Sequence, residues 1–288
     1  MSPILVHIHA YYPELLPGML EKLDSLLPAQ REVVVTTVAE HVATVQAMVA
    51  GIGNCRVQEV ENRGYDIAPF LEVIKGIELE QYSYVMKLHT KRNMPGDVYL
   101  KPLPYNYGFE RWREYLMNIC RPEHFQAAMR AFEQQARLGM VADFRLIWQQ
   151  EEPRFRAALD RLLSRAGLHK RGYAYIMGSM FICRAALLTP LLRLELRPQD
   201  FAPPDAAHSE NLAHEIERFL GLSVLAQGYS IGDPFTPRWK QGKLLRLLQQ
   251  AAMFLCFRKR GGDGSCIIKI CKIPVFRKRG AKARASRH

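Results

Sequence analysis

Charged side chains alternate along one short run of the sequence, YVMKLHTK, whose composition is typical of a β-strand and its end. Lys87, His89 and Lys91 occupy every second position, so the alternation of a strand directs all three to one side. In open α/β sheets, ligands bind beyond the carboxyl ends of the strands. A histidine, a threonine and two lysines at such an end predict an anion site, and a solvated strand end is the alternative.

A second polar segment, ENRGYDIAPFL, precedes that run. Asn62, Arg63 and Gly64 predict a turn after a strand, and Pro69 is compatible with the first turn of the helix that follows. Asp66 stands directly before this helix, where a carboxylate caps free backbone N–H groups. Two interpretations of Asp66 therefore stay open, a helix cap and a functional carboxylate.

Five other positions fall where ligand contacts are expected. His9 and Tyr11 come at the carboxyl end of the first predicted strand, and Thr36 comes near the end of the second, although threonine is also a good strand residue. Gly178, in YIMGSMFIC, permits the close approach of a ligand or marks a β-bulge. Trp112 lies between two arginines, and its aromatic face suits a sugar ring, with burial on a helix as the alternative.

The elements that must position these residues alternate along the chain. Composition and period predict strands at 3–8, 32–38, 55–60, 82–88, 139–143, 173–183 and 222–228. Apolar periodicity predicts helices at 15–27, 67–77, 122–137, 153–167 and 210–220. This alternation predicts an α/β domain over residues 1–237, with a mostly parallel, Rossmann-like sheet and helices on both faces.

Residues 238–288 differ in composition from the rest of the chain. They carry 15 Lys and Arg side chains against one acidic side chain, whereas residues 1–237 carry 25 basic and 27 acidic ones. Apolar residues form a helical stripe along 243–257, and FRKRG occurs twice around CIIKICKIPV. We expect a basic amphipathic tail that lies on an anionic membrane surface, with packing on the first domain as the alternative. A nucleic-acid partner is not expected, because the basic residues flank apolar stripes and do not alternate with stacking aromatics.

The overall composition is that of a globular, soluble protein. Of the 288 residues, 48% are hydrophobic and 24% charged, and no run reaches the ~18 apolar residues of a spanning helix. The first residues lack the basic start of a signal peptide, and the six cysteines show no metal-binding spacing. We therefore expect a cytoplasmic protein with free thiols.

Five motifs, in their order along the chain, resemble the rhamnan synthesis protein F family: HIHAYYPEL, NRGYDIAPFL, KLHTK, YIMGSMFICRAALL and LAHEIERFLG. These bacterial polysaccharide-assembly proteins are regarded as glycosyltransferases, and the resemblance runs from about residue 4 to residue 230. It implies a GT-A type fold that binds a nucleotide sugar. It also implies transfer of a sugar, often rhamnose, during synthesis of lipopolysaccharide, capsule or cell-wall glycan.

GT-A enzymes usually end the corresponding strand with Asp-x-Asp, which holds a divalent metal against the donor diphosphate. This chain has His89-Thr90-Lys91 there, and a charged lysine cannot ligate a hard cation. We therefore expect no metal cofactor, although one is possible, and expect cationic side chains to compensate the diphosphate. With dTDP- or GDP-rhamnose as favoured donors, the predicted donor site comprises His9, Tyr11, Thr36, Arg63, Asp66, Lys87, His89, Lys91 and Gly178.

An inverting transfer needs a carboxylate that deprotonates the acceptor hydroxyl. Glu210 is the first candidate, by its position after the YIMGSMFICR segment, although a glutamate also suits the start of a helix. The family tends to carry an acid one position earlier, where this chain has Ser209, so Asp205 and His208 stay open as alternatives.

The helix that starts near Glu210 also carries polar residues on the same face. His214 and Glu217 project with Glu210, opposite the apolar side of that helix. We expect His214, together with Trp112, to line the acceptor side of the site.

These predictions together describe a cytoplasmic glycosyltransferase, peripheral on the inner face of the membrane, that extends a lipid-linked polysaccharide. The alternative is a catalytically inactive α/β binding protein that docks on membrane or polysaccharide-assembly partners through its basic tail. The missing Asp-x-Asp favours the alternative, whereas the polar cluster at the strand ends favours the enzyme.

Overall fold

The computed structural model describes residues 3–26, 31–92, 109–203 and 212–237, and the backbone of 256–260, 266–270 and 273–278. The chain divides into two units. The first comprises Met1–Lys91 and Leu116–Phe235, and the second comprises Arg92–Tyr115 and Thr236–His288. The first unit therefore contains most of the predicted α/β domain.

A seven-stranded sheet in the order β3-β2-β1-β4-β8-β5-β9 forms the centre of the first unit. Only β8 runs antiparallel to its neighbours within this sheet, and the other strands are parallel. The strands are β1 (Ile4–His9), β2 (Arg31–Thr37), β3 (Cys55–Glu59), β4 (Tyr84–His89), β5 (Leu138–Val141), β8 (Phe181–Arg184) and β9 (Ser230–Gly232). A separate antiparallel pair consists of β6 (Ile147–Trp148) and β7 (Tyr175–Ile176).

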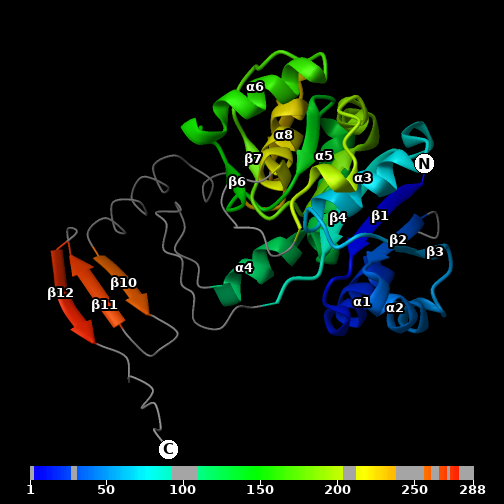
Figure 1. Ribbon diagram of the computed structural model, residues 1–288, viewed down its shortest axis with the longest axis horizontal. Coiled ribbons are helices and arrows are strands. Elements are labelled where there is room, and N and C mark those ends of the chain that lie inside the picture. The colour runs from blue at the N-terminus through cyan, green and yellow to red at the C-terminus, as the bar shows by residue number, and fades with distance from the viewer. Residues whose placement is uncertain are drawn as a thin grey trace, which may run out of the picture. The chain divides into compact units, whose positions relative to one another are not determined.

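Helices flank this sheet, as Figure 1 shows. They are α1 (Leu16–Leu26), α2 (Val42–Val49), α3 (Ile67–Lys75), α5 (Pro122–Gln134), α6 (Arg156–Arg165), α7 (Thr189–Leu192) and α8 (Leu212–Ala226). α3 packs against β1 and α8, whereas α1 packs against α5. The predicted α/β class, with a mostly parallel sheet flanked by helices, is confirmed.

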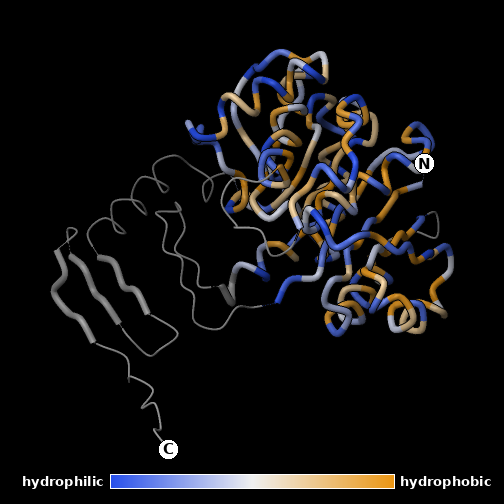
Figure 2. Tube along the Cα trace, viewed as in Figure 1, coloured by the Kyte–Doolittle hydropathy of each residue, from blue (hydrophilic) through white to orange (hydrophobic). Residues whose placement is uncertain are grey.

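The core follows from the hydrophobic runs of the central strands. Val33, Val34 and Val35 are consecutive in β2 and all buried, because both faces of a parallel sheet are covered by helices. Figure 2 shows hydrophobic colouring along these strands and hydrophilic colouring on outer turns. Lys87 and His7 interrupt this apolar interior, and both are buried.

The prediction for residues 222–228 needs correction. The strand predicted at 222–228 is wrong, because α8 continues to Ala226 and the next strand is β9. Gly221 explains part of this outcome. A Cβ built on Gly221 would lie 2.2 Å from the Ala174 carbonyl oxygen, so glycine permits the close approach of α8 to the segment before β7. Tertiary packing thus overrides the cost of glycine inside a helix. α2 was not among the predicted helices.

The second unit contains α4 (Phe109–Leu116), except for its last residue, and a three-stranded antiparallel sheet. Its strands are β10 (Cys256–Arg260), β11 (Cys266–Ile270) and β12 (Ile273–Lys278). Most of the helix predicted over 243–257 lies outside the described residues. Its last two residues belong to β10, so the predicted helix is wrong there.

Among the described helices, none combines the length and the apolar character needed to cross a membrane.

Candidate active site

The strand order reverses between β1 and β4. From β1 the chain continues to β2 and β3 on one side of the sheet, and then crosses to β4 on the other. Ligands of open α/β sheets bind at such a switch point, beyond the carboxyl ends of the strands. His9 ends β1 and is paired in register with His89, which ends β4. The sequence motifs are thereby brought to the expected ligand-binding edge.

Four polar side chains lie next to one another on the face of the sheet that α3 covers. The register pairs His7 with Lys87 and His9 with His89, and paired residues of parallel strands project to the same side. Phe70 of α3 lies over them, with its ring centroid 5.5 Å from that of His7 and 5.5 Å from Lys87 Nζ. All four polar residues are buried, and Lys87 is 0% exposed.

Asp66 and Ser179 neutralise and satisfy the buried ammonium group. Lys87 Nζ forms an ion pair with Asp66 Oδ2 and donates to Ser179 Oγ at 2.9 Å and to the Ser179 carbonyl at 3.2 Å. Ser179 Oγ also donates to Asp66 Oδ2. Asp66 occupies the N-cap position of α3 but makes no capping hydrogen bond with its side chain. The cap interpretation is therefore wrong, because the carboxylate compensates a buried charge instead.

The ionisation states follow from burial and from this ion pair. Burial raises the pKa of Asp66, but His89, Lys87 and Ser179 together hold it well below its usual range. Burial lowers the pKa of His9 to about 4 and that of His89 to about 3. The carboxylate of Asp66 raises both pKa values, and repulsion from Lys87 offsets part of that effect. Burial and Lys87 also hold the pKa of His7 well below its usual value. At neutral pH, the cluster thus combines one ion pair with three neutral imidazoles.

Thr36 connects two of these imidazoles. Its Oγ1 lies 2.9 Å from His7 Nε2 and 3.0 Å from His9 Nδ1. Because a hydroxyl has one proton, it donates to one ring and accepts from the other. Tyr11 stacks on His9, with ring centroids 6.4 Å apart. The predicted residues His9, Tyr11 and Thr36 therefore form one hydrogen-bonded and stacked group.

His89 differs from the other two histidines. Among the residues that the structure describes, neither of its ring nitrogens has a hydrogen-bond partner. Its Nδ1 lies 3.6 Å from Asp66 Oδ2, which is too far for a hydrogen bond. The residue is 6% exposed, and a buried polar group without a partner costs about 1–3 kcal/mol. Such a group is expected where a ligand completes the site.

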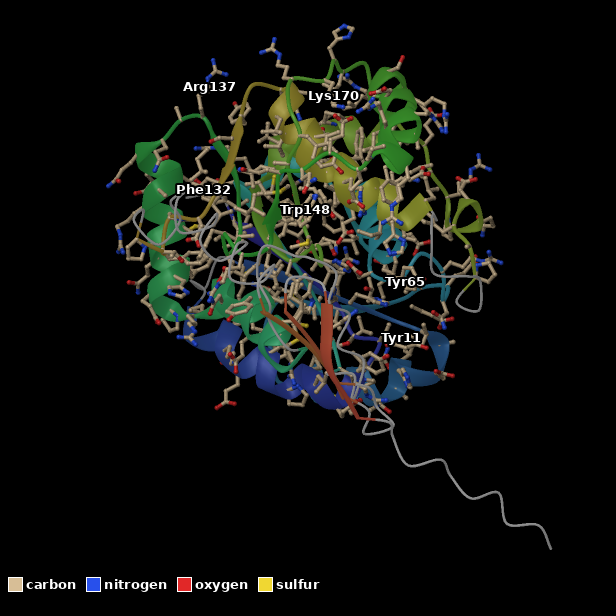
Figure 3. All side chains as sticks on the ribbon, turned by 90° about the vertical axis from the view of Figure 1, so that its left-hand side faces the viewer. Tyr11, Tyr65, Phe132, Arg137, Trp148 and Lys170 are labelled. Atoms are coloured by element: carbon tan, nitrogen blue, oxygen red, sulfur yellow. The ribbon has the colours of Figure 1, made fainter. Side chains whose placement is uncertain are left out.

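The loops around the cluster hold other predicted residues. Lys91 is exposed directly after β4. Tyr65, before α3, lies with its ring centroid 5.9 Å from that of His214 on α8. Figure 3 labels Tyr65 and Tyr11, which come from the segments before α3 and after β1. Arg63 donates to the Phe201 carbonyl at 2.9 Å and pairs with a neighbouring glutamate, so these contacts point to a structural role.

Four predicted residues lie outside the described part of the first unit, and two contacts were not predicted. Asp205, His208 and Glu210 lie outside the described residues, and Trp112 lies on α4 in the second unit. Ser179 binds the ion pair, and the Gly178 N–H donates to Glu217 Oε1 at 2.7 Å. The Gly-Ser pair in YIMGSMFIC was the available signal for both contacts.

The described residues of the polar cluster do not form a ligand set for a divalent metal. Within the described part of the chain, no three His, Cys, Asp or Glu side chains come together in a group that could hold a metal ion. The carboxylate of the cluster, Asp66, is already paired with Lys87. No step of the chemistry below is therefore assigned to a metal.

Comparison with known proteins gives matches in sequence and in structure. Proteins named WxcX from two Xanthomonas campestris pv. campestris strains, B100 and ATCC 33913, are 29% identical over 231 residues. This covers 78% of the chain and 32% of each relative, so the chain spans about a third of their length.

Two solved structures of S. aureus TarS 1-349 are 13% identical to the chain. The match to the first of these structures covers 80% of this chain and 58% of the TarS chain, with a TM-score of 0.42. The match to the second structure, TarS in complex with UDP-GlcNAc, covers 76% of this chain and 53% of the TarS chain, with a TM-score of 0.37. Both TM-scores are low, and the fold assignment above rests on strand order and register alone.

A protein-family model, described as rhamnan synthesis protein F, matches residues 1–229. The match includes all the residues of the cluster, from His7 on β1 to Ser179 before β8. It covers most of the chain, and the three strands of the second unit lie beyond it. The chain belongs to the rhamnan synthesis protein F family.

Proposed function

We propose that the chain is a glycosyltransferase that transfers a sugar, with rhamnose favoured, from a nucleotide-sugar donor to a growing polysaccharide. The observation that carries this proposal is the buried imidazole of His89 at the switch point between β1 and β4, whose ring nitrogens have no hydrogen-bond partner among the described residues. Membership of the family supports polysaccharide assembly as the setting.

The cluster suits the diphosphate of a nucleotide sugar. His89 is neutral, so it can donate one N–H to a phosphate oxygen, and its other nitrogen can accept a hydrogen bond from the donor. Lys91 is exposed after β4 and would supply positive charge to the departing nucleoside diphosphate. Lys87 is fully buried and paired with Asp66, so it would act by fixing the cluster and not by direct contact.

A donor panel tests this proposal. Thermal unfolding is measured with dTDP-rhamnose, GDP-rhamnose and several UDP-sugars, because a ligand that binds only the folded state raises Tm. We expect stabilisation by one rhamnose donor, a smaller shift in a His89→Ala variant, and slow release of nucleoside diphosphate. Absence of any shift across the panel would contradict the proposal. Binding without turnover, even with acceptor present, would favour the inactive binding protein.

Metal independence is tested separately, since no metal site was recognised among the described residues. We expect turnover to persist in EDTA. Complete loss that Mg²⁺ restores would refute this expectation.

For the base, Glu210 remains our first candidate, with Asp205 and His208 as alternatives, and an inverting outcome is expected. Glu210→Gln should lower kcat by about 10²–10⁴-fold with donor affinity near normal. If kcat is unchanged in Glu210→Gln, the role of the base passes to Asp205 or His208.

We further propose a lipid-linked glycan acceptor and a cytoplasmic location at the inner face of the membrane. The two basic stretches, 258–260 and 277–279, support contact with anionic lipid, at about 1 kcal/mol for each cation near the surface. Full-length protein should sediment with anionic vesicles at low salt and be released at high salt. Replacing these six cations by glutamine should abolish sedimentation, and equal binding of both proteins would exclude this surface.

A further inference from the structure

The turn between β7 and β8 has an unusual backbone. The Ser179 N–H donates to the Ile176 carbonyl at 3.1 Å, which closes a four-residue turn. Gly178 has φ 78°, as the third position of a type II turn requires, and Ser179 has φ 49°. A left-handed serine is unfavourable in isolation, so surrounding contacts must maintain it.

This conformation brings Ser179 to the ion pair. Its hydroxyl and its carbonyl oxygen both accept from Lys87 Nζ, and the hydroxyl donates to Asp66. A shift of the turn would remove both contacts at once. Lys87 and Asp66 would then lose part of the shell that holds them next to His89.

Glu217 connects the turn to α8. Its Oε1 accepts the Gly178 N–H at 2.7 Å, one residue before Ser179. The side chain is 17% exposed, and burial raises the pKa of its carboxyl group. A protonated carboxyl group keeps an acceptor oxygen, so the contact with Gly178 does not require the charge.

Arg218 holds the other oxygen of Glu217. Its Nη1 lies 3.3 Å from Glu217 Oε2, while its Nε and Nη2 donate to Glu152 Oε1 at 3.0 and 2.7 Å. Its guanidinium also lies between the rings of Phe155 and Tyr175, at 3.9 and 4.6 Å from their centroids. Glu217 is thus fixed from one side by a rigid cation and presents its other oxygen to the turn.

We propose that Glu217 is a positioning residue of the site. By accepting the Gly178 N–H, it holds the left-handed Gly178-Ser179 turn that keeps Ser179 on the Lys87–Asp66 pair. The effect on donor affinity rests on the proposed function. The effect on the turn rests on the geometry alone.

Two substitutions separate this role from that of a catalytic base. Glu217→Gln keeps an acceptor oxygen for Gly178 but removes the ability to take a proton. Glu217→Ala removes both the acceptor oxygen and the ability to take a proton. If the alanine variant does not fold, Glu217→Met is used in its place. Glu215→Ala, on the same helix, is the matched control, because no contact between Glu215 and the turn is seen among the described residues.

Hydrogen exchange of the Gly178 amide and rhamnose-donor affinity are measured for each variant. We expect Glu217→Ala to speed Gly178 exchange about tenfold or more and to weaken affinity for dTDP- or GDP-rhamnose by a similar factor. Glu217→Gln and Glu215→Ala should stay within about threefold of the wild type.

Two results would overturn the proposal. One is unchanged Gly178 exchange in Glu217→Ala. The other is a Glu217→Gln variant that binds donor normally yet loses turnover as severely as Glu217→Ala, which would make Glu217 the base. If the wild-type chain binds no nucleotide sugar, the proposed function fails, but the exchange measurement still decides whether Glu217 holds the turn.

Discussion

Lys87 and Arg218 are both buried cations of the first unit, yet their surroundings differ. Arg218 is 5% exposed and surrounded by partners: Glu152, Glu217, the His214 carbonyl and two aromatic rings. Tyr175 donates to the same Glu152 oxygen at 3.1 Å. A buried polar network of this kind fixes the packing of α8 on its neighbours.

Lys87 also has a carboxylate partner, but its neighbours do not form a closed network. His89, on the same strand, is buried with no hydrogen-bond partner for either nitrogen among the described residues. The guanidinium of Arg218 is thus bonded to structural partners through all three of its nitrogens, whereas Lys87 lies in a cluster whose His89 has unused hydrogen-bonding capacity among the described residues. A buried charge alone therefore does not mark a site, whereas an unsatisfied neighbour at the switch point does.

A fall in pH should destabilise the Lys87 cluster before it destabilises the Arg218 network, and this is the largest effect that we expect. The histidines of the Lys87 cluster have lowered folded-state pKa values, about 4 for His9 and about 3 for His89. Their stabilising contribution is complete above the unfolded pKa of about 6.5 and is lost as pH falls towards the folded values. Burial raises the pKa of Glu152, but Arg218 holds it below its usual value, so the Glu152–Arg218 pair loses stability only below about pH 4.5.

Urea unfolding at several pH values checks this expectation. The unfolding free energy should fall between pH 6.5 and 4.5 by about 1.4 kcal/mol per pH unit for each neutral histidine that gains a proton on unfolding. A constant unfolding free energy over this window would contradict the lowered pKa values of the three histidines.

Removing the buried ammonium should give the next largest effect. Lys87→Met leaves Asp66 without its ion-pair partner, so we expect a loss of about 3–5 kcal/mol in the unfolding free energy. Asp66→Asn should also destabilise the protein, because Lys87 then keeps a buried charge with no carboxylate. Lys91→Met, at an exposed position, serves as the control and should change stability by less than about 0.5 kcal/mol. Equal stability of all three variants would contradict the buried pair.

The unsatisfied histidine gives a test in which stability and function move in opposite directions. His89→Leu removes a buried polar group without a hydrogen-bond partner in the described structure, so we expect it to raise the unfolding free energy by about 1 kcal/mol. It should also weaken rhamnose-donor affinity about tenfold or more. Thermal unfolding with and without donor measures both effects. Normal donor affinity in this variant would place the donor elsewhere.

The smallest effect is expected in the Arg218 network. Tyr175→Phe removes one hydroxyl donor from Glu152, while Arg218 keeps its two hydrogen bonds to that carboxylate. We expect a loss of about 1 kcal/mol and no change in donor affinity. A marked drop in donor affinity would mean that the network is part of the site.

The sequence alone determined the class of the sheet and several of its strand ends. Hydrophobic runs and helical periods located β1 to β4, α1 and α3, because these signals are local and strong. The rule that ligands bind at carboxyl ends of strands then selected His9 and His89, which the register places side by side. The family followed from motifs spread over the first 230 residues.

Only the tertiary structure decided what the polar residues do. Asp66 has the sequence position of a helix cap, yet it pairs with Lys87, because the first N–H groups of α3 already donate to the Gly64 carbonyl and the buried ammonium requires a carboxylate. Ser179 and Glu217 are distant from both in sequence, and the fold of β7, β8 and α8 brings them together. Contacts of this kind depend on long-range packing, which local patterns of residue type do not encode.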